Sequence, residues 1–205
     1  MSVAVLDPPV AHPEPRIASE PFVWKWSRED LIRLHGLGFF DGHRIMLIDG
    51  EVLAMSPMKP AHANGIVFAL QQIQIALGPN FTVRPQMPLG LGQTTDPEPD
   101  IAVVAGSPRS HPETPATAVL VLEVSDTTLA FDLGDKASLY AAFGIADYWV
   151  LDVVNKRLHI LRDPRRDAKQ RFGFSYRDRQ ALNPNDRASP LAAAHTSILV
   201  ADLLP

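Results

Sequence analysis

The sequence predicts an α/β fold in which a mixed β-sheet is flanked by helices and preceded by a further helix and a β-hairpin. The segment AVLVLEVS, residues 118–125, is apolar at odd and even positions alike, as in a strand covered on both faces of a sheet. A helical pattern follows over 132–143, and 148–152 is again typical of a strand. Upstream, two apolar runs within 44–55 flank an Asp-Gly pair, which indicates a hairpin.

The length and composition indicate one globular domain. The chain has 205 residues, of which 46% are hydrophobic and 20% charged, which suits a single domain over 21–205 behind a flexible, proline-rich tail over 1–20. It has no cysteine, which excludes disulfides and thiolate zinc sites. No apolar run reaches membrane-spanning length and no signal pattern opens the chain, so we expect a soluble, cytoplasmic protein.

The first half of the domain contains the clearest local signals. Ser27 and Asp30 form a capping-box pattern that starts a helix, which glycines near 36 end. The hairpin over 44–55 turns at Asp49-Gly50. Apolar residues at helical spacing predict a helix over 62–77, ended by Gly78-Pro79.

The second half supplies the strands of the sheet. Alternating or continuous apolar runs predict strands at 81–89, 100–104, 118–124, 148–152, 157–161 and 171–176. The last two are predicted to form a hairpin across a loop at Pro164. Between the third and fourth strands, Asp132 is the predicted N-cap of a helix, Asp135 lies in its first turn and Gly144 ends it.

Two acidic residues occupy strands that are otherwise apolar. Glu123 shares a strand face with Val119 and Val121, and Asp100 begins the run PDIAVV. A buried carboxylate is costly unless a cation or a hydrogen-bond network meets it, so a shared partner is the simplest explanation. The alternative for Asp100 is an ordinary turn acid at the start of a strand.

Lys136 is the predicted third member of this group. It falls in the apolar stripe of the helix over 132–143, together with Leu133 and Tyr140. The alternative is that its long side chain extends along the helix to solvent. An Asp, a Glu and a Lys that converge in a core of sheet and helix suggest a site for a hard cation beside a positioned ammonium group.

The order of these motifs resembles the Uma family of endonucleases, which belongs to the restriction-endonuclease-like PD-(D/E)XK superfamily. The chain shows PD, then EVS, then D-x-x-x-K, then G-I-x-x-Y-W-V-x-D, preceded by DGEVLAMSP and H-x-N-G. The resemblance runs from about Arg44 to Asp152. It implies a restriction-endonuclease-like core and a nuclease that cleaves nucleic acid, most often DNA.

The superfamily pattern places a lysine two residues after the acid, where this chain has Ser125. The Uma-like pattern takes the lysine from the following helix, which is the position of Lys136. The resemblance also implies that Glu51 is an auxiliary acid and that His62 lies close to the carboxylates. The alternatives are an exposed turn acid for Glu51 and a capping or surface residue for His62.

The implied chemistry is metal-assisted phosphodiester hydrolysis. Asp100 and Glu123 are the expected ligands of Mg²⁺ or Mn²⁺, with the backbone carbonyl near Val124 as a further ligand. Lys136 would orient the attacking water or stabilise developing charge, with Glu51 as an accessory group. His62 is the other expected accessory residue.

Charge is distributed unevenly along the chain. The net charge is −4, but residues 156–187 contain ten Lys or Arg and four Asp, a balance of +6. This stretch is a candidate nucleic-acid face, with Arg165 and Arg166 as predicted contacts, or simply an exposed, arginine-rich hairpin. A homodimer is expected by analogy, because cutting a duplex requires two strands to be cut.

Three classes of function fit these observations. The first is a metal-dependent nuclease, which the complete Asp, Glu and Lys set favours. The second is a nucleic-acid-binding or regulatory module that kept the fold and lost turnover. The third is a metal-dependent hydrolase of another phosphoester, since the fold does not name a substrate.

Overall fold

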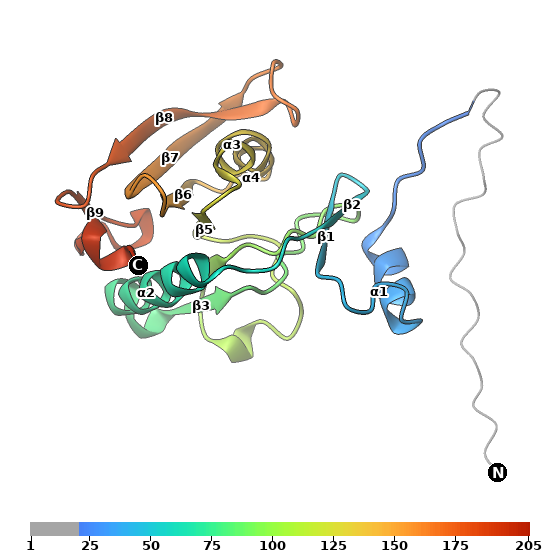
Figure 1. Cartoon of the computed structure of the whole chain (residues 1–205), viewed down its shortest axis with the longest axis horizontal. Coiled ribbons are helices and arrows are strands. Elements are labelled where there is room, and N and C mark those ends of the chain that lie inside the picture. The colour runs from blue at the N-terminus through green and yellow to red at the C-terminus, as the bar shows by residue number, and fades with distance from the viewer. Residues whose placement is uncertain (1–20) are drawn as a thin grey trace, which may run out of the picture.

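The computed structural model describes residues 21–205, so the predicted tail over 1–20 lies outside the described residues. Its centre is a six-stranded sheet (Figure 1). β5 and β6 are parallel, and the other neighbouring strands are antiparallel. The predicted mixed sheet between helices is therefore confirmed. In spatial order its strands are β3 (Phe81–Pro85), β4 (Ile101–Ala105), β5 (Leu120–Ser125), β6 (Asp147–Asp152), β7 (Arg157–Arg166) and β8 (Phe174–Leu182).

A helical crossover joins the two parallel strands, because parallel neighbours cannot be connected by a tight turn. It runs without a break through α3 (Leu129–Phe131), a π-helical turn (Asp132–Lys136) and α4 (Ala137–Ala142). Tyr140 of this crossover packs against Tyr148 and neighbouring apolar residues on one face of the sheet. That face also carries Glu123, which places the acid beneath the crossover helix.

The opposite face of the sheet is covered by α2 (Pro60–Leu77) and by the C-terminal segment (Figure 1). Proline opens α2 at a position where its missing N–H is not needed. The C-terminal segment adds the short strands β9 (Arg187–Ala188) and β10 (Ile198–Leu199). Together, α2 and the C-terminal segment bury Trp149 in the larger apolar core.

The N-terminal part of the described chain has the two predicted elements. α1 (Arg28–Gly36) starts with a complete capping box, in which Ser27 and Asp30 each accept a hydrogen bond from the other's backbone N–H. β1 (Ile45–Ile48) and β2 (Glu51–Ala54) pair through a two-residue turn. Asp49 and Gly50 both have positive φ there, 49° and 71°, which suits the Asp-Gly sequence of the turn.

The crossover helix starts one turn earlier than predicted, so the assignment of Asp132 as its N-cap was wrong. The helix begins at Leu129, and Asp132 lies inside it. Its side chain accepts a hydrogen bond from Thr128 Oγ1 at 2.5 Å, and its backbone carbonyl accepts one from the Tyr148 hydroxyl at 2.9 Å. Asp132 therefore has its partners within the core.

The β7–β8 hairpin exists, but its predicted turn at Pro164 was wrong. Pro164 lies within β7, paired with Tyr176. The turn is at 167–173, where the Asp167 side chain accepts hydrogen bonds from Lys169 N and Gln170 Nε2. These local bonds, and Gly173 at φ 71°, provide the turn chemistry that Pro164 lacks.

Candidate active site

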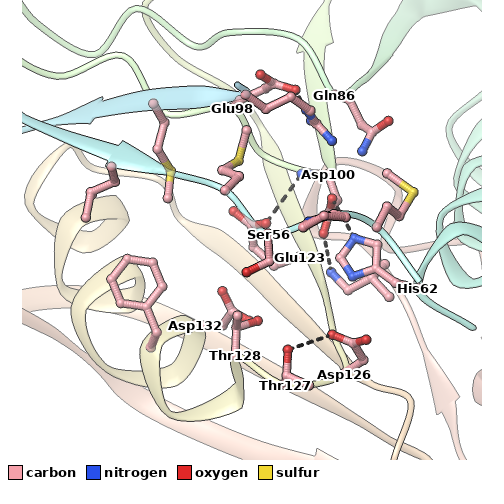
Figure 2. A pocket seen from close by; sticks show the side chains of 18 of the residues that line it. Ser56, His62, Gln86, Glu98, Asp100, Glu123, Asp126, Thr127, Thr128 and Asp132 are labelled. Carbon is pink, nitrogen blue, oxygen red and sulfur yellow. Dashed lines mark hydrogen bonds and ion pairs between the residues drawn. The ribbon is translucent and has the colours of Figure 1, made fainter. Parts of the chain in front are cut away.

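A cavity of about 450 Å³ lies where the β1–β2 hairpin and the start of α2 meet β4, β5 and the crossover helix (Figure 2). Five predicted site residues line it: His62, Asp100, Glu123, Val124 and Lys136. The fold thus brings together residues that lie up to 74 positions apart in the sequence (136 − 62 = 74).

Asp100 immediately precedes β4 and points into this cavity. Its Oδ1 lies 3.0 Å from His62 Nε2, and its Oδ2 accepts a hydrogen bond of 2.8 Å from the backbone N–H of Val124 (Figure 2). The residue is 9% exposed. Two elements therefore fix the carboxylate: β5 through its backbone, and α2 through a side chain in its first turn.

Glu123 lies within β5, close to Asp100 at the start of the neighbouring strand β4, and is 2% exposed. Its Oε1 accepts a hydrogen bond of 2.8 Å from the Tyr140 hydroxyl, and its Oε2 lies 2.9 Å from Lys136 Nζ. The backbone N–H of Asp100 is 3.4 Å from the same Oε2. A network of this kind is what a buried carboxylate requires.

Lys136 enters the cavity from the last position of the π-helical turn. Its Nζ also lies 3.4 Å from Asp132 Oδ1, and the residue is only 8% exposed, so its side chain does not extend to solvent. Burial lowers the pKa of Lys136, but the charges of Glu123 and Asp132 outweigh burial and raise it overall. Lys136 is therefore an ammonium group at neutral pH, which makes it a donor and not a base.

Glu123, which lies beside Lys136, and His62, which lies beside Asp100, also have shifted pKa values. Burial raises the pKa of Glu123 to about 7; Lys136 opposes this shift, and Asp100 adds to it. Burial lowers the pKa of His62, but its hydrogen bond to Asp100 and the nearby carboxylates raise it overall. The carboxylates, the ammonium group and the imidazole thus lie close enough together that the protonation of one changes the pKa values of the others.

Several polar residues that line the cavity were not predicted as site residues, among them Asp132, Glu98 and Gln86. Asp132 pairs with Lys136 across one helical turn, a spacing that could have indicated the contact. Glu98 lies two residues before Asp100 and forms an ion pair with Arg44. Gln86 has no such local signal, since the loop after β3 alone brings it to the cavity.

Other predicted site residues lie elsewhere. Glu51 is not among the cavity-lining residues; its half-exposed carboxylate lies 2.7 Å from Arg171 Nη2, at the tip of the β7–β8 hairpin. Arg165 pairs with Asp163 at 2.9 Å, and Arg166 stacks over an aromatic ring of β8. The structure therefore does not bring Glu51 to the carboxylates, and the two arginines lie three strands beyond Asp100, on exposed parts of β7.

The donor groups of the cavity fit a magnesium ion held by few protein ligands. Among residues 21–205, no group of three or more His, Asp or Glu side chains is placed to hold a metal ion. Mg²⁺, however, is commonly bound through one or two carboxylates and retains several waters. Asp100 and Glu123 provide two carboxylates on adjacent strands that face one cavity, which matches that requirement.

Within residues 21–205, no helix combines the length and the apolarity that crossing a membrane requires.

Comparisons with known proteins place this geometry in a family. A solved structure described as "a putative nuclease belonging to DUF820", from Anabaena variabilis, aligns with a TM-score of 0.59 at 14% sequence identity, covering 78% of this chain and 88% of that one. At that identity the similarity shows the fold alone. No curated protein matches the chain. The Uma2 family model, described as "Putative restriction endonuclease", matches residues 28–199. Because that match covers more than half of the chain, the protein belongs to the Uma2 family.

Proposed function

We propose that this protein is a metal-dependent endonuclease that hydrolyses phosphodiester bonds in nucleic acid, with DNA as its substrate. One observation carries the proposal: Asp100, Glu123 and Lys136 meet in a single cavity of a chain that belongs to a nuclease family. Cutting both strands of a duplex would require two such sites, which a homodimer would supply.

Asp100 and Glu123 would hold Mg²⁺ or Mn²⁺, with the Val124 carbonyl as a further ligand. Such an ion neutralises charge on phosphoryl oxygens and makes water more acidic. The hydrogen bonds from His62 and from the Val124 N–H hold Asp100 in one orientation, and the Tyr140 hydroxyl does the same for Glu123. We assign His62 and Tyr140 as positioning residues on this basis.

Lys136 would contribute positive charge where negative charge develops during hydrolysis. Its ammonium group is already fixed by Glu123 and Asp132, so little reorganisation is needed when substrate binds. Because Lys136 remains protonated, it would stabilise the oxyanion or orient the attacking water, and would not remove a proton. This role needs no lysine at position 125.

The test is a magnesium titration of nuclease activity on plasmid and single-stranded DNA. Wild type should cleave only when Mg²⁺ or Mn²⁺ is present, and Glu123→Ala should lose both cleavage and metal binding measured by calorimetry. Glu51→Ala is the matched control, because Glu51 lies outside the cavity. Equal metal binding by wild type and Glu123→Ala would contradict the proposed ligand set.

A second candidate is a nucleic-acid-binding module without turnover. The observation that favours it is the Lys136 ammonium, which already neutralises Glu123 at 2.9 Å. This candidate predicts nucleic-acid binding that does not respond to magnesium, with no cleavage at any magnesium or manganese concentration. The titration above therefore separates the two functions.

A further inference from the structure

The candidate catalytic groups lie in a cavity that is too small for a nucleic-acid duplex. Asp100, Glu123 and Lys136 are each less than a tenth exposed. The cavity has a volume of about 450 Å³. A whole duplex, whose major groove alone is about 12 Å wide, could not enter a cavity of this volume. Sites of this volume take ligands the size of one small molecule, and a single nucleotide belongs to that class.

One wall of the cavity is apolar and is built mainly by the β1–β2 hairpin. Met46 lies in β1, Leu53 in β2, and Met55 and Met58 follow β2. Three of the five methionines in the chain thus face one cavity. Contacts to a phosphate backbone alone would favour lysine and arginine at these positions. Methionine side chains instead adapt their shape and pack favourably against aromatic rings.

Gln86 gives the cavity an unused hydrogen-bonding group. Its side-chain Nε2 is buried, and within residues 21–205 no protein atom accepts a hydrogen bond from it. Gln86 lines the cavity together with Glu98, on one side of Asp100 (Figure 2). A buried amide without a partner is costly unless a ligand or water satisfies it. Glutamine and asparagine amides match the hydrogen-bonding edges of nucleobases.

The backbone of Gln86 supports the same conclusion independently. Its φ is +48°, a conformation that side chains other than glycine, asparagine and aspartate rarely adopt. The backbone N–H donates to the carbonyl of Asp100 at 3.0 Å, which fixes the residue directly beside the candidate metal ligand. Strain of this kind persists only where the surrounding structure holds the residue in place, and it is frequent at active sites and ligand-binding sites.

We infer that this cavity takes an unpaired nucleotide, with its phosphate at the metal ion proposed for Asp100 and Glu123 and its base between the methionine wall and the Gln86 amide. The substrate class is therefore single-stranded nucleic acid, or unpaired nucleotides at a flap, bulge or end of a duplex. The cleavage step rests on the proposed nuclease function, whereas recognition of an unpaired base rests on the cavity itself.

The first test compares three DNA substrates of one sequence under identical conditions: single-stranded, fully paired, and paired with an unpaired flap. The single strand should be cleaved at least about tenfold faster than the paired duplex, because unpairing costs a few kcal/mol that only the duplex must supply. Cuts in the third substrate should fall in or beside the flap. Equal or faster cleavage of the fully paired duplex would overturn the inference.

The second test examines the recognition residues through substrate binding. Binding of a short fluorescent oligonucleotide is followed by anisotropy, with calcium in place of magnesium. Gln86→Leu, which keeps the side-chain size but removes the amide, should weaken single-strand binding about threefold to tenfold. Gln74→Leu at an exposed position of α2, outside the cavity and outside residues 156–187, is the matched control and should bind as wild type does. Unchanged binding by Gln86→Leu would contradict the assigned contact.

The methionine wall can be tested in the same assay with surface-accessible residues, so that folding is preserved. Met58→Ala should weaken single-strand binding, whereas Met87→Ala, a methionine of similar exposure outside the cavity, should not. Equal effects of the two substitutions would contradict a base-binding wall.

The two tests also separate this inference from the proposed nuclease function. Preferential, Gln86-dependent binding of single strands without any cleavage would contradict the nuclease function and support the inference. Cleavage of paired and single-stranded DNA at similar rates, with Gln86→Leu unaffected, would support the nuclease function and contradict the inference.

Discussion

Lys136 reaches the cavity from the crossover helix, whereas the superfamily pattern places its lysine on the strand, two residues after the acid. The strand position two residues after Glu123 is occupied by Ser125, whose Oγ lies 3.4 Å from Thr128 Oγ1 at the start of the crossover helix. The π-helical turn then places Lys136 so that its Nζ contacts both Glu123 and Asp132. π-helical turns of this kind are frequent at functional sites.

Replacing Lys136 with methionine should reduce turnover far more than substrate binding. Methionine keeps much of the side-chain volume but removes the charge, so a contact used mainly in the transition state is lost. We expect a fall in kcat of about 100-fold or more and oligonucleotide affinity close to that of wild type. Single-turnover kinetics and anisotropy measure the two quantities, with exposed Lys25→Met, outside the cavity and outside residues 156–187, as control. Cleavage by Lys136→Met at the wild-type rate would exclude the proposed role.

His159 is a partly buried titratable residue outside the cavity. Its Nε2 has no hydrogen-bond partner within the described residues and lies 3.9 Å from Asp152 Oδ2. Burial lowers the pKa of His159; Asp152 opposes this shift and Arg157 adds to it. The unfolded chain, with an ordinary histidine pKa of about 6.5, therefore binds this proton more readily than the folded protein does.

The neutral form of His159 should therefore stabilise the fold above about pH 6.5, and this contribution should be lost as the pH falls below that value. His159→Gln removes the titration, so its melting temperature should fall less than that of wild type between neutral and mildly acidic pH. Calorimetry at a series of pH values measures the difference, with His195→Gln on the surface as control. Identical pH profiles for His159→Gln and wild type would exclude this assignment.

At the scale of elements, the position of α2 on the sheet determines where His62 lies. A Cβ atom on Gly65 would come within 2.9 Å of Val124 Cγ1 and 3.4 Å of Val153 Cγ1. Glycine thus allows the first turns of α2 to approach β5 closely. Since Val124 also donates its N–H to Asp100, this contact joins α2, β5 and β4 at the cavity.

Gly65→Ala should destabilise the protein although alanine is the better helix former. Overpacking costs about 1–3 kcal/mol, against roughly 1 kcal/mol gained in helix propensity. The expected net loss lowers the melting temperature by a few degrees, at about 2–4 °C per kcal/mol for a domain of this size. Gly36→Ala in α1, where an added Cβ meets nothing within 4 Å, is the control and should be neutral or stabilising. A melting temperature for Gly65→Ala at or above wild type would show that α2 can shift without cost.

The β7–β8 hairpin links parts of the molecule that are distant in sequence. Arg171 at its tip lies 2.7 Å from Glu51 of β2 and 3.0 Å from Asp135 of the crossover helix. These exposed ion pairs contribute little energy individually. They do explain why Glu51, which the family resemblance implied as an auxiliary acid, is turned toward the hairpin tip and not toward the carboxylates.

At the scale of the whole molecule, basic residues collect at one end of the sheet and the cavity lies toward the other. The strands β7 and β8 carry most of the +6 balance of residues 156–187, whereas Asp100 lies at the start of β4. Arg165 and Arg166 lie on β7, three strands away from β4 in the sheet. The two predicted contact regions can therefore be tested separately.

Reversing Arg165 and Arg166 to Glu should weaken oligonucleotide binding and reduce its salt dependence, while metal affinity stays unchanged. Each phosphate contact that is lost reduces the slope of log K against log salt by about 0.7 for a single strand. The measurement is anisotropy over a range of salt concentrations. Arg33→Glu with Arg109→Glu is the control, because it makes the same charge change outside this stretch. An unchanged slope in Arg165→Glu with Arg166→Glu would identify these arginines as solvated surface.

The sequence by itself determined the approximate positions of the six strands, the N-terminal hairpin and three of the residues that line the cavity. Asp100, Glu123 and Lys136 could be found because a charged group in an apolar run is costly, and that cost is visible in the local pattern. The capping box at Ser27 and the Asp49-Gly50 turn could be predicted for a similar reason, since their chemistry is complete within a few residues.

Only the tertiary structure decided which distant residues join these three. Gln86 and Met46 reach the cavity through packing between elements, and no local pattern in the sequence encodes that contact. Glu51 shows the converse, since a local motif suggested a site residue but the distance to the carboxylates depends on how the hairpin docks. Local patterns record the energetics of neighbours along the chain, whereas a cavity is formed by the packing of whole elements, whose contacts depend on every core residue at once.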